Sequence, residues 1–306
     1  MRRFTQSRLL TVWLDWFILM AQKVAIITDS SACIPGELLR QYRIGLVPLN
    51  VIIGHKTYQD GVDITPTEFY ALLRETEELP MTSHSSPGAH LEAYRQASQI
   101  APGILCITLS ASFSGQFSSA QVARELAGES LPGVAIEVLD CGTAAAAQGL
   151  VVLAAARAAA SGWSLGEVVE KAKRVAERVH LVAMVDTLHY LVRGGHVPKA
   201  AAWASSLFRI KPLLTLSDGD VRPLAKTRTT ARAITRMLKA MKQMVIKGLP
   251  LHVAVMHADA LDNAELLKEQ IASRFDCSEL FITEFTPVMG AHIGPGLIGV
   301  AFCSGD

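Results

Sequence analysis

The 306-residue chain lacks an excess of either charge, because 29 Lys and Arg stand against 28 Asp and Glu, which leaves a formal net charge of +1. Proteins that hold nucleic acid by neutralising phosphates carry a marked basic excess, so we expect no nucleic-acid partner. Cysteine is scarce too, with five residues and no Cys-x-x-Cys pair. An odd number of scattered cysteines indicates neither a disulfide framework nor a metal site, and predicts a reduced, cytoplasmic protein.

The common signatures of nucleotide-binding and hydrolytic enzymes are also missing. The chain has no Gly-x-Gly-x-x-Gly motif after its first strand-like run, no Walker phosphate loop, no His-Glu-x-x-His motif and no Gly-x-Ser-x-Gly elbow. A Ser-His-Asp hydrolase stays open, because triads are defined by geometry and not by sequence position. No spacing in the chain supports one.

The N-terminal residues 1–21 lack the features of a good membrane span and of a secretory signal. Their apolar part is short, it is interrupted by Asp15, and no Ala-x-Ala cleavage site follows it. We therefore expect a separate N-terminal extension. It is either a surface helix or a stretch upstream of the true translation start at Met20.

The rest of the chain alternates short apolar runs with helical segments. Strand-like runs cover residues 24–28, 44–53 and 104–109, and a Ser/Thr-x-x-Glu capping box opens helical segments at Thr65 and Ser164. This βαβα order predicts an α/β fold with a largely parallel sheet flanked by helices.

The pattern changes near residue 163. In the second half an Asp-Gly turn at residues 218–219 separates two strand-like runs, which is a hairpin signal and predicts antiparallel pairing. We therefore predict two α/β domains. The N-terminal one spans residues 22–163, and the C-terminal one spans residues 164–306 and has a mixed sheet with helices.

Three aspartates that follow strand-like runs are candidate catalytic acids or metal ligands. Asp29 ends the first run, and its simpler role is that of a helix N-cap. Asp60 and Asp63 lie in a loop with turn chemistry but without calcium-loop spacing. A metal-dependent phosphotransferase or hydrolase that uses these aspartates is the alternative function.

Hydroxyl groups are concentrated at two junctions between a strand-like run and a helix. Thr82 and Ser83 precede a helix whose N-cap is assigned to Ser86, so capping does not account for them. Residues 108–114 supply one threonine and three serines before Gly115 and the next helix. One hydroxyl suffices as a cap, so the others, together with the free N–H groups of the helix, could bind an anion.

Two further motifs combine histidine with glycine. His292 precedes a Gly-Pro-Gly turn, where the backbone can approach a ligand closely. A Gly-Gly turn brings Arg193, His196 and Lys199 into one short stretch. A lone histidine is usually structural and a basic turn is usually solvated, so neither motif identifies a site by itself.

Taken together, the motifs resemble those of the DegV family of bacterial fatty-acid-binding proteins. They are VAIITDSSA, YQDGVDITPTEFY, PMTSHSSP, TLSASFSGQFSSA, YLVRGGHV and HIGPG, in this order from about Lys23 onward. The resemblance implies a lipid carrier and not an enzyme, without a cofactor, that buries one long-chain fatty acid in a tunnel between two domains. It also implies that the protein is the non-catalytic subunit of a bacterial fatty acid kinase and presents the carboxylate to a separate ATP-dependent partner. We further expect a transient contact with a membrane surface.

The resemblance also assigns roles to residues of this chain. The carboxylate would be held by Thr82, Ser83, Ser114, Gly115 and His292. The kinase partner would be contacted by Arg193 and His196.

The chain departs from the family pattern at three places. Family members often have two threonines where this chain has Met81-Thr82, Gln-Pro where it has His84-Ser85, and Arg where it has His196. The first departure leaves the carboxylate donors intact. His84 is expected to change the polarity near the head group, and His196 weakens the case for the partner contact.

Overall fold

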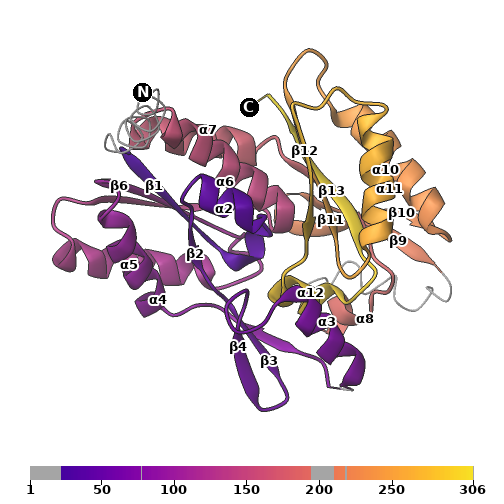
Figure 1. Ribbon diagram of the computed structural model, residues 1–306, viewed down its shortest axis with the longest axis horizontal. Coiled ribbons are helices and arrows are strands. Elements are labelled where there is room, and N and C mark those ends of the chain that lie inside the picture. The colour runs from indigo at the N-terminus through magenta and orange to yellow at the C-terminus, as the bar shows by residue number, and fades with distance from the viewer. Residues whose placement is uncertain (1–21, 77, 194–209, 218, 306) are drawn as a thin grey trace, which may run out of the picture.

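A computed structural model describes residues 22–76, 78–193, 210–217 and 219–305 of the chain, and these form two α/β domains that lie side by side (Figure 1). The N-terminal domain has a four-stranded sheet and the C-terminal domain a six-stranded sheet, while a third sheet of three strands projects from the N-terminal domain (Figure 1). The predicted fold class is confirmed.

The N-terminal sheet is parallel throughout and has the strand order β2-β1-β6-β7. Its strands are β1 (Val24–Asp29), β2 (Gly45–Val47), β6 (Gly103–Thr108) and β7 (Ala135–Asp140). All residues of the central strands β1 and β6 are buried, as expected of parallel strands covered on both faces. Since the strands are parallel, the segments that follow β1 and β6 leave the sheet at the same edge.

Helices cover both faces of this sheet. They are the short 3-10 helix η1 (Ser30–Ala32), α2 (Gly36–Gln41), α4 (Pro87–Ser98), α5 (Gln116–Ser130), α6 (Ala145–Ala160) and α7 (Leu165–Ala176). Helices α4 and α5 pack on the face that presents Ile27 and Ile104, whereas α6 and α7 pack on the face that presents Ile26 and Leu105. Helix α7 follows the predicted boundary at residue 163 but contacts β6 and β7 of the N-terminal sheet.

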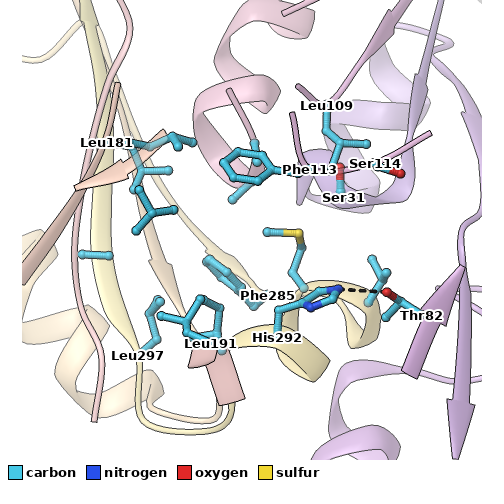
Figure 2. Close-up of a pocket in the computed structure, with 18 of the residues that line it drawn as sticks. Ser31, Thr82, Leu109, Phe113, Ser114, Leu181, Leu191, Phe285, His292 and Leu297 are labelled. Carbon is cyan, nitrogen blue, oxygen red and sulfur yellow. Dashed lines mark hydrogen bonds between the residues drawn. The ribbon is translucent and has the colours of Figure 1, made fainter. Parts of the chain in front are cut away.

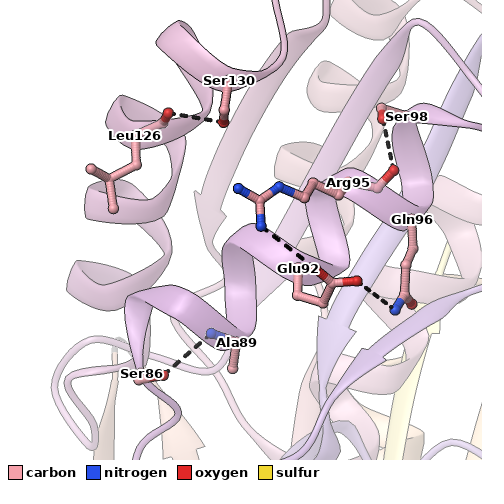
Figure 3. A network of polar contacts seen from close by, with 8 residues as sticks. All are labelled: Ser86, Ala89, Glu92, Arg95, Gln96, Ser98, Leu126 and Ser130. Carbon is pink, nitrogen blue, oxygen red and sulfur yellow. Dashed lines mark hydrogen bonds and ion pairs between the residues drawn. The ribbon is translucent and has the colours of Figure 1, made fainter.

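Helix α4 begins as the sequence predicts. Ser86 is its N-cap and accepts a hydrogen bond from the N–H of Ala89 at 3.2 Å (Figure 3). On the exposed side, Glu92 accepts a hydrogen bond from Gln96 at 3.2 Å and pairs with Arg95 at 3.7 Å (Figure 3). Because Ser86 caps the helix, the hydroxyls upstream of it are not needed for capping.

The alanine-rich helix α6 is a core helix. Only Arg157 and Ala160 of its residues are not buried. Its small side chains allow it to contact β1 of the N-terminal sheet as well as strands of the C-terminal sheet, among them β11 (Leu251–His257) and β13 (Ile298–Ser304). The helix is therefore shared by the two domains.

The C-terminal sheet is mixed, with the strand order β10-β9-β8-β13-β11-β12. Its remaining strands are β8 (His180–Met184), β9 (Lys211–Ser217), β10 (Asp220–Thr227) and β12 (Glu279–Glu284). Strands β9 and β10 form the predicted antiparallel hairpin, and only β11 and β12 pair in parallel among the described strands of this sheet. Helices α10 (Thr230–Met244) and α11 (Leu261–Ala272) cover its outer face.

The strand predicted over residues 44–53 is wrong in one respect. It is divided between β2 and a second strand, β3 (Asn50–Ile53), which belongs to the projecting sheet. Pro48 lies between the two strands, where it has no N–H to continue a ladder. Strand β3 pairs antiparallel with β4 (Lys56–Gln59) and β5 (Met81–Ser83).

The projecting sheet is joined to the C-terminal domain by helices. Helix α3 (Pro66–Glu75) follows the predicted capping box and packs against α12 (Pro287–Ile293), which also contacts β5. Helix α12 also contacts α8 (His189–Arg193). These contacts bring β5 close to α12.

Two of the sequence-based expectations lie outside the described residues. These are the N-terminal extension over residues 1–21, with a start at Met20, and the partner contact at His196. Within the described ranges, no helix combines the length and the apolar character that crossing a membrane requires.

Candidate functional site

A cavity of about 380 Å³ lies between the two domains (Figure 2). Its volume is within the range of small-molecule binding sites. Leu109 and Phe113 line it from the N-terminal domain, whereas Leu181 and Phe285 line it from the C-terminal domain (Figure 2). Any molecule in the cavity would therefore touch both domains.

Most of the cavity wall is apolar. The apolar lining residues are Leu49, Leu109, Phe113, Ala144, Ala145, Leu181, Ala183, Val185, Leu191, Leu214, Leu216, Val221, Phe285, Val288, Met289, Ile293 and Leu297. No Asp, Glu, Lys or Arg is found among the described lining residues. Such a wall favours a long apolar ligand, because the removal of apolar surface from water is the main source of affinity there.

Polar side chains gather at one side of the cavity (Figure 2). The Oγ1 atom of Thr82 on β5 lies 2.9 Å from Nε2 of His292 on α12, which is hydrogen-bond distance. The tautomer of the ring decides which of the two donates. The two residues are 210 positions apart in sequence, so this bond joins the domains across the polar side of the cavity.

The structure brings together all five residues that the sequence proposes for a carboxylate. They are Thr82, Ser83, Ser114, Gly115 and His292, and each lines the cavity. Their role as ligands remains a prediction. Arg193 is the last residue of α8, and its contact with a partner also remains a prediction.

The hydroxyls that precede α5 have different tasks. Ser112 donates a hydrogen bond to the carbonyl of Gly219 at 2.6 Å, and its Oγ lies 2.9 Å from that of Ser110, so this pair anchors the β9–β10 turn. Ser114 accepts a hydrogen bond from the N–H of Gln116 at 3.3 Å. Among the described residues no acceptor takes the Ser114 proton, so this O–H can donate to a ligand.

Sequence reasoning missed Ser31, which also lines the cavity. Its Oγ lies within hydrogen-bond distance of Asp29 Oδ1 and, at 2.9 Å, of Gln148 Oε1, and its one proton is donated to either of these acceptors. The available signal was the position of Ser31, because it follows β1 at the sheet edge where Leu109 follows β6.

Asp29 is the N-cap of η1, which is the role favoured by the sequence. It is fully buried and accepts hydrogen bonds from the N–H groups of Ser31 at 3.1 Å and Leu109 at 2.9 Å. Burial raises the pKa of its carboxyl, and these hydrogen bonds oppose the shift. Asp29 therefore fixes the backbone of two cavity-lining residues.

Asp60 and Asp63 do not line the cavity. Burial raises the pKa of Asp60 to about 7, while the side chains of Ser30 and Thr286 oppose the shift. Asp63 accepts the N–H of Gln59 at 2.8 Å and so closes its turn. Across the described ranges, no group of three His, Cys, Asp or Glu is placed to hold a metal ion.

Comparison with known proteins places the chain in a family. A family model described as uncharacterised protein of the DegV family matches residues 23–305. A DegV domain-containing protein of Streptomyces coelicolor is 36% identical over 287 residues, which cover 93% of this chain and 100% of that protein.

Two solved structures are similar over the same range. One, described as fatty acid binding of a DegV family protein from Thermus thermophilus, has a TM-score of 0.85 and 30% identity over 92% of this chain and 99% of that chain. The other, described as a stearic acid-binding protein from Eubacterium ventriosum, has a TM-score of 0.85 and 25% identity over 92% of this chain and 98% of that chain. The sequence and the fold thus agree, and the chain belongs to the DegV family.

Proposed function

We propose that the protein binds one long-chain fatty acid in the interdomain cavity, with the acyl chain along the apolar wall and the carboxylate against the polar side. The observation that carries this proposal is the division of the cavity wall. Thr82, Ser114 and His292 line a cavity of about 380 Å³ whose wall is mostly apolar. Family members described as binding fatty acids support the same ligand class.

The energetics suit this ligand. Each buried methylene contributes about 0.8 kcal/mol, so roughly fourteen methylenes contribute on the order of 11 kcal/mol before the costs of association are subtracted. A carboxylate loses its hydration on burial and needs hydrogen-bond donors in return. The hydroxyl of Ser114 can donate to the carboxylate, and so can the hydroxyl of Thr82 when Nε2 of His292 donates its proton to Thr82.

We further propose that the protein is a cytoplasmic, cofactor-free carrier and the non-catalytic subunit of a fatty acid kinase. A separate ATP-dependent subunit would phosphorylate the bound acid, with Arg193 and His196 at the contact. The neutral donor set supports this proposal, because a carboxylate oxygen held only by neutral donors is a better nucleophile than one held in an ion pair with Arg or Lys. Lipid phosphorylation that requires both the loaded protein and an added kinase is the expected result.

A transient contact with an anionic membrane surface is part of the same proposal. The stretch 221–258 contains eight Lys and Arg and no Asp or Glu. The exposed side of α10 presents Arg232, Arg236, Lys239 and Lys242, none of which forms an ion pair with another described residue. Ile246 and Leu249 are exposed just beyond the helix. Near an anionic bilayer each such cation contributes about 1 kcal/mol.

Vesicle binding tests the membrane contact. We expect the protein to sediment with phosphatidylglycerol vesicles at low salt and not with neutral vesicles. Replacing Arg232 and Arg236 by Gln should weaken binding roughly 30-fold. The same two changes at Arg40 and Arg43, exposed cations of the N-terminal domain, serve as the control. Equal weakening by both pairs would remove α10 as the contact surface.

The fatty acid itself is tested by native mass spectrometry of the purified protein, followed by denaturation and analysis of the released lipid. We expect one fatty acid per chain. A protein that is empty and also refuses added fatty acid would overturn the proposed function.

A further inference from the structure

Gln116, the first residue of α5, connects the two segments that carry the proposed carboxylate donors. Its side chain is fully buried. The Oε1 atom accepts the N–H of Ser85 at 2.9 Å, and Nε2 donates to Oγ of Ser85 at 3.1 Å. Ser85 is itself buried and donates its hydroxyl proton to the carbonyl of Pro48 at 2.7 Å. One amide thus makes two hydrogen bonds to a single residue of the neighbouring segment.

The same residue is also tied to the other donor segment. The backbone N–H of Gln116 reaches Oγ of Ser114 at 3.3 Å, and Ser85 lies three positions after Thr82. Between the two segments, the ring of His84 packs against Gly115 so closely that a Cβ there would lie 3.1 Å from Cε1 of the ring. The two segments therefore contact each other through the two hydrogen bonds between Gln116 and Ser85 and through the packing of His84 on Gly115.

The Gln116 amide lies among buried residues. Buried His90 faces it, and burial lowers the pKa of the His90 ring to about 4, which keeps the ring neutral. In such a low-dielectric setting hydrogen bonds hold geometry firmly, and a lost partner is costly.

We propose that Gln116 is a positioning residue, which through Ser85 fixes the distance between Thr82 and Ser114 so that both can donate to one carboxylate. This inference rests on the proposed function. The arrangement depends on the serine at position 85, because a proline there would offer neither an N–H nor a hydroxyl to the amide.

The test compares a long-chain fatty acid with the fatty alcohol of the same length, because both fill the apolar wall and only the acid needs the paired donors. The dissociation constants of both are measured for the wild type and for Gln116→Met, which keeps the side-chain volume and removes the amide. We expect the wild type to prefer the acid. In the variant the ratio of the dissociation constants of alcohol and acid should fall roughly tenfold, because one charge-assisted hydrogen bond to the carboxylate is misplaced. Its affinity for the alcohol should stay unchanged.

Three further variants complete the experiment. Gln121→Met, the same exchange on the same helix at a residue that does not line the cavity, should leave the preference unchanged. Ser85→Thr should keep it and Ser85→Ala should reduce it. Adding Ser85→Ala to Gln116→Met should cost little more, since the two residues act as one unit.

Each outcome decides something specific. A wild type that does not prefer the acid overturns the proposed function, and this inference with it. A wild type that prefers the acid together with a Gln116→Met variant that prefers it equally overturns the positioning role alone. Equal losses for acid and alcohol would show a general structural role and would also overturn it. If Gln116→Met does not fold, Ser85→Ala decides by the same comparison.

Discussion

The depth of the cavity can be tested at Ala183. This residue lies on β8, is buried and lines the cavity from the C-terminal sheet. Ala183→Leu adds three carbons to the apolar wall. These would displace about three methylenes of a bound acyl chain, which corresponds to about 2.4 kcal/mol, or roughly 50-fold in affinity, for an acid that fills the cavity.

The assay is the dissociation constant of saturated acids with twelve to eighteen carbons, measured for both proteins. In the wild type each two-carbon step should contribute about 1.6 kcal/mol until the cavity is full. In Ala183→Leu this gain should stop about three carbons earlier, and Ala183→Val should fall between the two. An equal loss at every chain length, or no loss at all, would refute the assignment of this wall to the acyl chain.

Three further predictions concern stability. Asp29→Ala should lower the urea midpoint by the equivalent of about 3 kcal/mol, because the N–H of Leu109 loses its buried acceptor. Burial raises the pKa of Asp60 from 3.8 to about 7, so the folded protein keeps a proton that the unfolded chain releases. The free energy of unfolding should therefore fall as pH rises from about 4 to about 7, and Asp60→Asn should flatten that part of the profile. Gly294→Ala should lower the melting temperature, because φ is +72° there and a Cβ would lie 2.2 Å from the ring of Tyr190.

Much of the fold could be predicted from local patterns. The capping box at Thr65, the N-cap at Ser86 and the hairpin of β9 and β10 are each set by a few neighbouring residues, and all three are confirmed. The projecting sheet was not predicted, because Pro48 interrupts an apolar run that otherwise reads as one strand. Which sheet a short strand joins depends on distant partners, and no local pattern reports them.

The residue types of the candidate site could be predicted from the sequence, but the hydrogen bonds between its residues could not. The hydroxyls around Thr82 and Ser114 indicated an anion site, since each junction has more of them than the single one that a helix cap needs. The bond between Thr82 and His292 depends on the packing of two domains, and it links positions 210 residues apart. The link from Gln116 to Ser85 was also invisible, because a glutamine at a helix start normally faces solvent.

The cavity lies within the core cluster that contains residues of both domains, such as Leu150 of α6 and Ala254 of β11. A core with an unfilled space loses contacts on every wall, so a molecule that fills this space completes the core. The fraction of the protein that holds a ligand and the stability of the contact between the two domains are then linked. If the ligand is the proposed fatty acid, the melting temperature of the intact chain rises with the supply of lipid and so reports that supply without a measurement of the lipid itself.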